Sequence, residues 1–247
     1  MRIAVAGATG TVGREVVTHA RTRGHDVVEL ARSRGVDLVT GAGVAAALAG
    51  ADTVIDVASV GTLSAQASTT FFRAATGNLL REARRTGAQH AVLLSIVGIN
   101  ANPHGYYAGK VAQEELVTTG PVPWTIVRAT QFHEFAGQVA AQAKAGPLQL
   151  APRARVQPIA AVEVARHLVG IAENAPIGRA TDITGPREEE LAEMVRAWVR
   201  RRGARGPVLA VPLPTAQMRG MRRGAQLPGA DALRLGPTYA DWLSARG

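Results

Sequence analysis

Short apolar runs alternate with longer stretches of helical spacing through the first part of this chain. Each run is rich in Val, Ile, Leu and Ala, and each stretch carries apolar residues three or four positions apart. Strands that alternate with helices in this way are typical of a doubly wound α/β fold on a parallel sheet. We expect strands at residues 3–7, 27–31, 36–39, 52–58, 91–95 and 123–128. We expect helices at residues 14–23, 43–50 and 67–86, and a fourth from residue 106 through residue 115.

The rhythm changes near residue 145, where Gly146, Pro147 and several later prolines interrupt it. Beyond that point we expect helices at 162–173 and 187–202 and short strands at 181–184 and 208–211. The pattern predicts two parts, a sheet domain at 1–145 and a smaller C-terminal region at 146–247. That region would pack on the first domain and cover its ligand edge, and the pattern leaves open that the chain crosses back to the sheet.

The first apolar run ends in a turn where Gly7, Gly10 and Gly13 are spaced three residues apart. A tight turn needs backbone angles that glycine adopts freely, and an anionic pyrophosphate needs bare backbone N–H groups. The helix after the turn must also pack closely on the strand. Thr9 and Thr11 add hydroxyl donors for the same anion. Strand, glycine turn and helix in this order predict a Rossmann-like dinucleotide site, although such turns also occur without a ligand.

The end of the second strand bears on which dinucleotide binds. An acidic residue about 20 positions past the glycines would bind a ribose 2′-hydroxyl and favour NAD. This chain has Arg32 there, with Ser33 beside it, and a guanidinium suits the 2′-phosphate of NADP by charge and geometry. We expect NADP(H) as the preferred cofactor, bound by Arg32 and Ser33. Glu29 lies slightly earlier and leaves NAD(H) open, and the alternative for Arg32 is an ordinary surface arginine.

Two segments follow the carboxyl ends of expected strands, where open α/β sheets bind ligands. The segment after the fourth strand has small side chains that would let a cofactor lie flat. We expect cofactor contacts from Ala58, Ser59, Val60 and Thr130. His133 is left out of the catalytic set, because a lone histidine usually has a structural role.

The residues that can carry chemistry begin at the end of the fifth strand. Tyr106 and Lys110 are four positions apart, so on one helix they lie on the same face. A nearby ammonium would lower the pKa of the phenol and make it a usable general acid. Ser95 could hydrogen-bond a substrate carbonyl or hydroxyl. We predict Ser95, Tyr106 and Lys110 as the catalytic set, with Tyr107 as the rival phenol.

The composition narrows the function classes. The formal net charge is +9, carried almost entirely by arginine, which favours anionic partners such as a phosphorylated cofactor. The basic cluster at 196–205 lacks the aromatic interleaving of a nucleic-acid surface, so we expect a solvated helix end and no nucleic-acid partner. Cysteine is absent, which excludes disulfides and thiolate metal sites, and no metal site is expected. Neither a membrane span nor a signal peptide is evident, so we expect a cytoplasmic protein, monomeric or homodimeric, with a small-molecule substrate.

These motifs resemble those of the short-chain dehydrogenase/reductase superfamily, and in particular its atypical, NmrA-like NAD(P)H-binding group. The resemblance covers most of the chain and rests on residues 7–13, 31–34, 94–98, 106–110 and 128–135. It implies an NAD(P)-binding domain at 1–145. It implies cofactor contacts from Gly7, Thr9, Gly10, Thr11, Val12, Arg32, Ser33, the Ala58–Val60 segment, Lys110 and the loop around Thr130. Relatives often carry an Asp at the adenine after the third strand, where this chain has Thr40-Gly-Ala-Gly43.

The sequence favours an NADPH-dependent oxidoreductase that transfers hydride to a small-molecule carbonyl, quinone or conjugated alkene. Tyr106 would donate the proton, Lys110 would hold the nicotinamide ribose, and Ser95 would orient the substrate. Many relatives lack the tyrosine and act as redox sensors. The alternatives are therefore a non-catalytic NADP(H) sensor of the NmrA type, and an epimerase or dehydratase that retains its cofactor.

Overall fold

The computed structural model describes residues 1–145, 148–203 and 206–246. It divides the chain into two compact units, between which the chain passes several times. Unit 1 comprises Met1–Ser95, His104–Arg128 and Val162–Thr181, and unit 2 comprises Ile96–Pro103, Ala129–Ala161 and Asp182–Gly247. The domain boundary expected between residues 145 and 146 stays a prediction, and Gly146 and Pro147 lie outside the described residues.

Unit 1 is built on a parallel sheet. Its strands lie in the order β2-β1-β3-β4-β5, and the short β9 also pairs with β5. Their bounds are β1 Arg2–Ala6, β2 Asp26–Leu30, β3 Thr53–Asp56, β4 His90–Ile96, β5 Trp124–Ala129 and β9 Gly178–Arg179. The non-sequential order, with a helix between most strands, confirms the expected doubly wound α/β fold.

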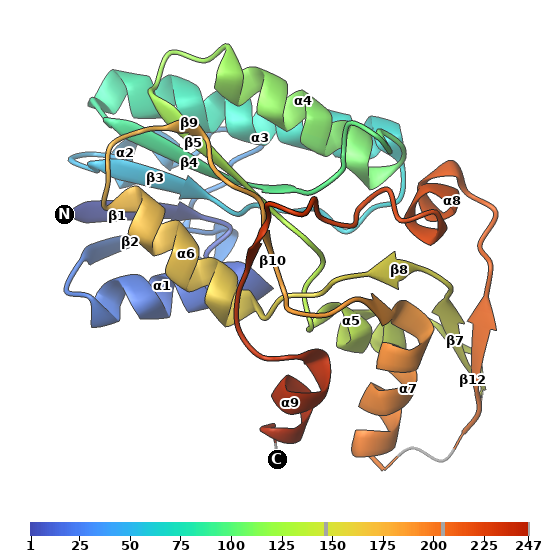
Figure 1. The fold of residues 1–247 in the computed structure, drawn as a ribbon. Helices are drawn as coiled ribbons and strands as arrows, with labels where there is room; N and C mark the ends of the chain where they lie inside the picture. Colours follow the sequence, from blue (N-terminus) through green and yellow to red (C-terminus); the bar gives the residue numbers. More distant parts are fainter. Residues whose placement is uncertain (146–147, 204–205, 247) are drawn as a thin grey trace. The chain divides into compact units, whose positions relative to one another are not determined.

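Helices cover both faces of this sheet (Figure 1). In the figure α3 (Ala65–Thr86) and α4 (Tyr106–Thr118) lie together on one face, and α1 (Thr11–Thr22) and α6 (Ala161–Ala172) lie on the other. The short α2 (Val44–Ala47) precedes β3. Because both faces are buried, the strands read as continuous apolar runs, and residues 3–6 of β1 are 0% exposed. The parallel register places the carboxyl ends of β1 and β3 at one edge, with Ala6 beside Asp56.

The strand expected at 36–39 is wrong. The chain instead forms a short 3-10 helix, η1 (Arg32–Arg34), followed by turns through residue 43. Asp37 accounts for the difference, because its carboxylate accepts hydrogen bonds from the backbone N–H groups of Val39 at 2.8 Å and Thr40 at 3.2 Å. Such local side-chain bonds compete with a strand ladder and favour a turn.

Unit 2 contains short strands and several helices. β10 pairs in parallel with β13, β11 with β8 in antiparallel fashion, and β7 with both β6 and β12. Their bounds are β6 Lys144–Ala145, β7 Leu148–Pro152, β8 Arg155–Val156, β10 Ile183–Thr184, β11 Glu189–Glu190, β12 Val208–Val211 and β13 Leu233–Arg234. The helices are α5 Phe135–Gln142, α7 Leu191–Arg201, α8 Ala216–Arg222 and α9 Tyr239–Ser244.

α7 begins four residues later than the expected helix at 187–202, because Glu189 and Glu190 form β11 first. The apolar side chains Leu191, Met194 and Val195 of α7 are buried. No helix in the described part of the chain is both long and apolar enough to cross a membrane.

Candidate functional site

At two positions of the glycine turn after β1, Gly7 and Gly13, the neighbouring backbone leaves no room for a Cβ atom. Gly7 has a φ of +79°, and a Cβ atom there would lie 2.8 Å from the Cα of Ala58. A Cβ atom on Gly13 would lie 2.1 Å from the carbonyl oxygen of Gly7. The turn therefore joins the segment after β3 to the start of α1 through backbone contacts.

The start of α1 fits an anion. The helix begins at Thr11, and its N-cap is Gly10, which has no side chain to bond the exposed N–H groups. No acidic residue lies in the first turn, and Thr9 and Gly10 are exposed. The N–H groups of a helix's first turn and the positive end of its dipole together favour a phosphate. The geometry thus fits a dinucleotide pyrophosphate, and the contacts expected from Thr9, Thr11 and Val12 stay predictions.

Of the arginines near the end of β2, Arg34 has a carboxylate partner and Arg32 has none among the described residues. Arg32 is exposed, and its guanidinium makes no hydrogen bond or ion pair with any described residue. Glu29, which left NAD open, lies within β2 and accepts a hydrogen bond from Arg21 at 2.8 Å. Arg34 lies 3.9 Å from the same carboxylate. Arg32 is therefore available to a ligand, whereas Glu29 already faces two guanidinium groups.

Tyr106 is the first residue of α4, so the phenol and Lys110 share one helix as expected. The phenol oxygen lies 2.9 Å from the hydroxyl oxygen of Ser59, in the segment that packs against the glycine turn. The hydroxyl of Ser68 on α3 donates to the backbone carbonyl of Tyr106 at 2.8 Å, and the ring meets Phe72 edge-on. A phenol at the carboxyl edge of the sheet is thus held by two neighbouring segments of unit 1.

Lys110 does not act on the phenol as the sequence suggested. Its side chain is buried, and Nζ donates to the backbone carbonyl of Leu94 at 2.7 Å and to the amide oxygen of Gln113. Burial lowers the pKa of Lys110 to about 8. The pKa of Tyr106 is raised, mainly by burial; the hydrogen bond with Ser59 lowers it in part, and the charge of Asp56 raises it further. The expectation that Lys110 lowers the phenol pKa is therefore wrong.

Ser95 is 1% exposed and lies beside a different group. Its hydroxyl helps to lower the pKa of Glu114, although no hydrogen bond of standard geometry joins them. Arg128 binds the Glu114 carboxylate at 2.7 Å and Arg179 at 2.8 Å, so this buried charge is well compensated. The role of Ser95 toward substrate stays a prediction, and the hydroxyl that meets the phenol is that of Ser59.

Thr130, expected to contact the cofactor, and His133, left out of the catalytic set, both lie in unit 2. Thr130 is buried, and its hydroxyl donates to the backbone carbonyl of Gln157 at 2.6 Å. His133 is fully buried, with ring centroids 5.6 Å from Tyr239 and 5.2 Å from Trp242. Burial lowers the pKa of His133 to about 4, so the ring is neutral near pH 7. His133 is therefore part of a packed aromatic cluster, and the cofactor contact of Thr130 stays a prediction.

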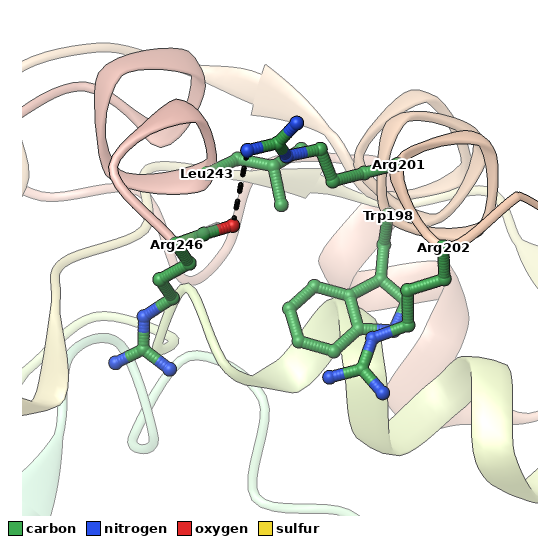
Figure 2. A pocket seen from close by; sticks show the side chains of 5 residues that line it. All are labelled: Trp198, Arg201, Arg202, Leu243 and Arg246. Atoms are coloured by element: carbon green, nitrogen blue, oxygen red, sulfur yellow. Dashed lines mark hydrogen bonds between the residues drawn. The ribbon is translucent and has the colours of Figure 1, made fainter.

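Two arginines of the basic cluster, Arg201 and Arg202, line a hollow of about 320 Å³ in unit 2 (Figure 2). It is lined by Trp198, Arg201, Arg202, Leu243 and Arg246. Arg201 donates to the backbone carbonyls of Ser244 and Arg246, at 3.3 and 3.2 Å. Arg202 and Arg246 each stack on a tryptophan ring, 4.5 and 4.2 Å from its centroid. These guanidinium groups thus bond the end of α9 and cover indoles; Arg205, also in the expected cluster, lies outside the described residues.

Comparison with known proteins identifies the family. A family model described as NAD(P)H-binding matches residues 7–175, more than half of the chain. The chain belongs to this NAD(P)H-binding family. The match begins at Gly7 and spans the glycine turn, Arg32, Ser59, Tyr106 and Lys110, and it supports a nicotinamide dinucleotide as the cofactor. A comparison with curated protein sequences finds no match.

Solved structures show the same fold. An NADPH-dependent quinone oxidoreductase from Escherichia coli, complexed with NADPH, aligns with a TM-score of 0.73 at 16% identity, covering 98% of this chain and 99% of that one. MoeE5, in complex with UDP-glucuronic acid and NAD, aligns with a TM-score of 0.73 at 17% identity over 100% and 99%. A short-chain dehydrogenase/reductase superfamily protein from Agrobacterium tumefaciens, with bound NAD, gives 0.69 at 16% over 99% and 95%. These likenesses show that the chain shares the fold of these three NAD- or NADPH-bound proteins.

Unit 1 also contains a buried carboxylate, Asp56, which was not among the residues predicted from the sequence. Asp56, the last residue of β3, is 6% exposed and accepts hydrogen bonds from Thr76 on α3 and Gln113 on α4, each at 3.0 Å. A signal was present in the sequence, since Asp56 is an ionisable residue between the apolar residues Ile55 and Val57 of the expected strand. Its partners could not be found there, because they lie 20 and 57 positions away.

Proposed function

We propose that this protein is an NADPH-dependent reductase in which Tyr106 donates a proton to a small-molecule carbonyl, quinone or conjugated alkene. The observation that carries the proposal is the 2.9 Å contact between the Tyr106 phenol and Ser59. Ser59 belongs to the segment that packs on the glycine turn, so the phenol stands beside the turn expected to hold the pyrophosphate.

The residues of unit 1 can divide the cofactor between them. The uncapped first turn of α1 suits the pyrophosphate, and the unengaged guanidinium of Arg32 suits a 2′-phosphate. When bound, the reduced nicotinamide supplies a hydride. This chain's own contribution is then to orient the substrate and to deliver the proton from the hydroxyl of Tyr106 to the oxygen that gains charge.

The phenol carries its proton in the cofactor-free protein. Burial raises the pKa of Tyr106, so the hydroxyl stays protonated near neutral pH. A protonated phenol can donate its proton to a substrate oxygen, but a raised pKa makes it a weaker acid than the lysine-assisted phenol expected from the sequence. The pKa therefore does not separate reduction from epimerisation, and the turnover assay below does.

Replacing the phenol tests the proposal. Tyr106→Phe should bind NADPH as the wild type does and lose about 10²- to 10⁴-fold in turnover, the usual contribution of a positioned general acid. NADPH oxidation is followed by the absorbance of the reduced nicotinamide against a panel of carbonyls and quinones. Tyr107→Phe is the matched control, since Tyr107 is the neighbouring phenol and is buried, 5% exposed. Full turnover by Tyr106→Phe refutes the mechanism.

Two other outcomes would favour the alternatives. Cofactor binding with no NADPH oxidation against any member of the panel indicates a sensor. A cofactor that copurifies and is not consumed indicates an epimerase or dehydratase. The cytoplasmic location, the monomeric or homodimeric state, the small-molecule substrate and the absence of a nucleic-acid partner stay predictions.

A further inference from the structure

A buried carboxylate lies behind the segment that meets the phenol. Asp56 ends β3, and its Oδ1 accepts a hydrogen bond from the backbone N–H of Ala58 at 3.0 Å. Its Oδ2 accepts from the Thr76 hydroxyl and from the Gln113 side-chain amide, each at 3.0 Å. Three donors on one carboxylate favour its ionised form, although burial raises the pKa of Asp56.

The Ala58 contact links this carboxylate to the phenol. Ala58 precedes Ser59 in the chain, and the Ser59 hydroxyl lies 2.9 Å from the phenol oxygen of Tyr106. The segment from 57 to 64 has no helix or strand of its own. A backbone hydrogen bond from Val57 to Ala6 holds its start at 3.0 Å, and side-chain contacts add to this. Asp56 supplies one of these contacts at the point where β3 ends.

Lys110 belongs to the same hydrogen-bond network and is connected to Asp56 through Gln113. Its Nζ donates to the Gln113 side-chain oxygen, and the Gln113 amide nitrogen donates to Asp56. The ammonium also lies 4.9 Å from the centroid of the Phe72 ring. These contacts direct the Lys110 side chain toward the interior of unit 1, so it supports Asp56 instead of meeting the phenol oxygen.

We propose that Asp56 is a positioning residue for Tyr106: it holds the backbone that presents Ser59 to the phenol, and its charge opposes loss of the phenol proton. Lys110 and Gln113 hold Asp56 in turn. The effect on turnover rests on the proposed reductase function, but the effect on the phenol does not.

The charged groups of the network allow the sign of each change to be worked out. The charge that acts on the phenol is that of Asp56. On α4 the charged groups are Lys110 and Glu114, and Glu114 is paired with Arg128 on β5. The α3 side chains that enter the network are uncharged. Because the pKa of Lys110 is about 8, the ammonium has lost its proton before the phenol titrates. The charge of Asp56 then opposes phenolate formation, whereas the Ser59 hydrogen bond favours it.

A titration of the phenol in the cofactor-free protein tests the proposal. The chain has three tyrosines, and subtracting the ultraviolet pH titration of Tyr106→Phe isolates the phenolate signal of Tyr106. Asp56→Asn should move the Tyr106 titration to lower pH, because the opposing charge is removed while the Asn side-chain oxygen can still accept from the Ala58 N–H. Ser59→Ala should move it to higher pH, because a donor to the phenolate is lost. Asp52→Asn, at the exposed start of the same strand segment, is the matched control and should leave it unchanged.

Opposite shifts in the two variants support the proposal, and an unchanged titration in Asp56→Asn with native circular dichroism overturns it. If Asp56→Asn does not fold, Asp56→Ser decides, since it removes the same charge and keeps a side-chain oxygen near the Ala58 N–H. A shift to lower pH supports the proposal, and no shift or the opposite shift overturns it.

The turnover assay keeps the two proposals apart. In an active enzyme, Asp56→Asn should move the alkaline limb of the kcat profile to lower pH, in step with the phenol titration. If no substrate is ever turned over while the titrations shift as expected, the reductase function falls and the positioning role of Asp56 stands. If Tyr106 is essential for turnover but its titration is the same in Asp56→Asn as in the wild type, the reductase function stands and the positioning role of Asp56 falls.

Discussion

Arg32 gives the sharpest test of cofactor choice in this NAD(P)H-binding protein. It is exposed in η1, directly after β2, and its guanidinium has no partner among the described residues. Replacing it with alanine removes a charge and a hydrogen-bonding edge without breaking an internal contact. The stability of the cofactor-free protein should therefore change by less than about 0.5 kcal/mol.

The expected loss of affinity follows from the chemistry of the contact. A hydrogen bond to a charged group contributes about 1.5 to 3 kcal/mol, and the exposed position of Arg32 favours the lower end of this range. Arg32→Ala should accordingly weaken NADPH binding about 10- to 30-fold and leave NADH binding within about twofold. The difference between the two cofactors should shrink at high salt, because solvent ions screen an exposed pair.

Titration of each variant with NADPH and NADH, by calorimetry or nicotinamide fluorescence, measures both affinities. Arg34→Ala is the matched control, since its guanidinium already lies 3.9 Å from Glu29 and should contribute less to a 2′-phosphate. Unchanged NADPH affinity in Arg32→Ala refutes the assignment. An equal loss for NADH also refutes it, because NADH has no 2′-phosphate.

Two further predictions concern the glycine turn and the buried histidine. Gly13→Ala should lower the free energy of unfolding by about 1 to 3 kcal/mol and weaken both dinucleotides, because its Cβ would lie 2.1 Å from the carbonyl oxygen of Gly7. Gly77→Ala on α3 is the control, because a Cβ atom there meets nothing within 4 Å. It should raise the free energy of unfolding by about 0.5 to 1 kcal/mol, measured with denaturant. Equal effects of the two substitutions would contradict the steric argument. The pKa of His133 is lowered from 6.5 to about 4, so the unfolded chain binds the proton first and stability falls as the pH drops through that window. The free energy of unfolding is measured with urea near pH 7 and at about pH 4. His133→Phe should make its decrease between these two pH values smaller by about 3 kcal/mol. An equally large decrease in the variant would show that another group is responsible.

The elements of unit 1 were largely predictable, because both local signals and burial favour the same structure. β1 is a continuous apolar run before glycines, and α3 ends at Gly87, which adopts a φ of +85°. The strand expected at 36–39 failed because hydrogen bonds of the Asp37 side chain prevailed over a weak apolar pattern. The late start of α7 reflects the pairing of β11 with β8, a contact more than 30 positions away in the chain.

The sequence by itself determined the glycine turn, the cationic residue after the second strand and the placement of Tyr106 and Lys110 on one helix. These depend on spacing within a few residues, which backbone geometry makes readable. Only the tertiary structure decided what surrounds each side chain. It buried Lys110 beside Gln113, placed Ser95 against Glu114, and brought Ser59 to the phenol. A pKa depends on burial and on charges from other segments, so no spacing along the chain could have shown that the pKa of Tyr106 is raised.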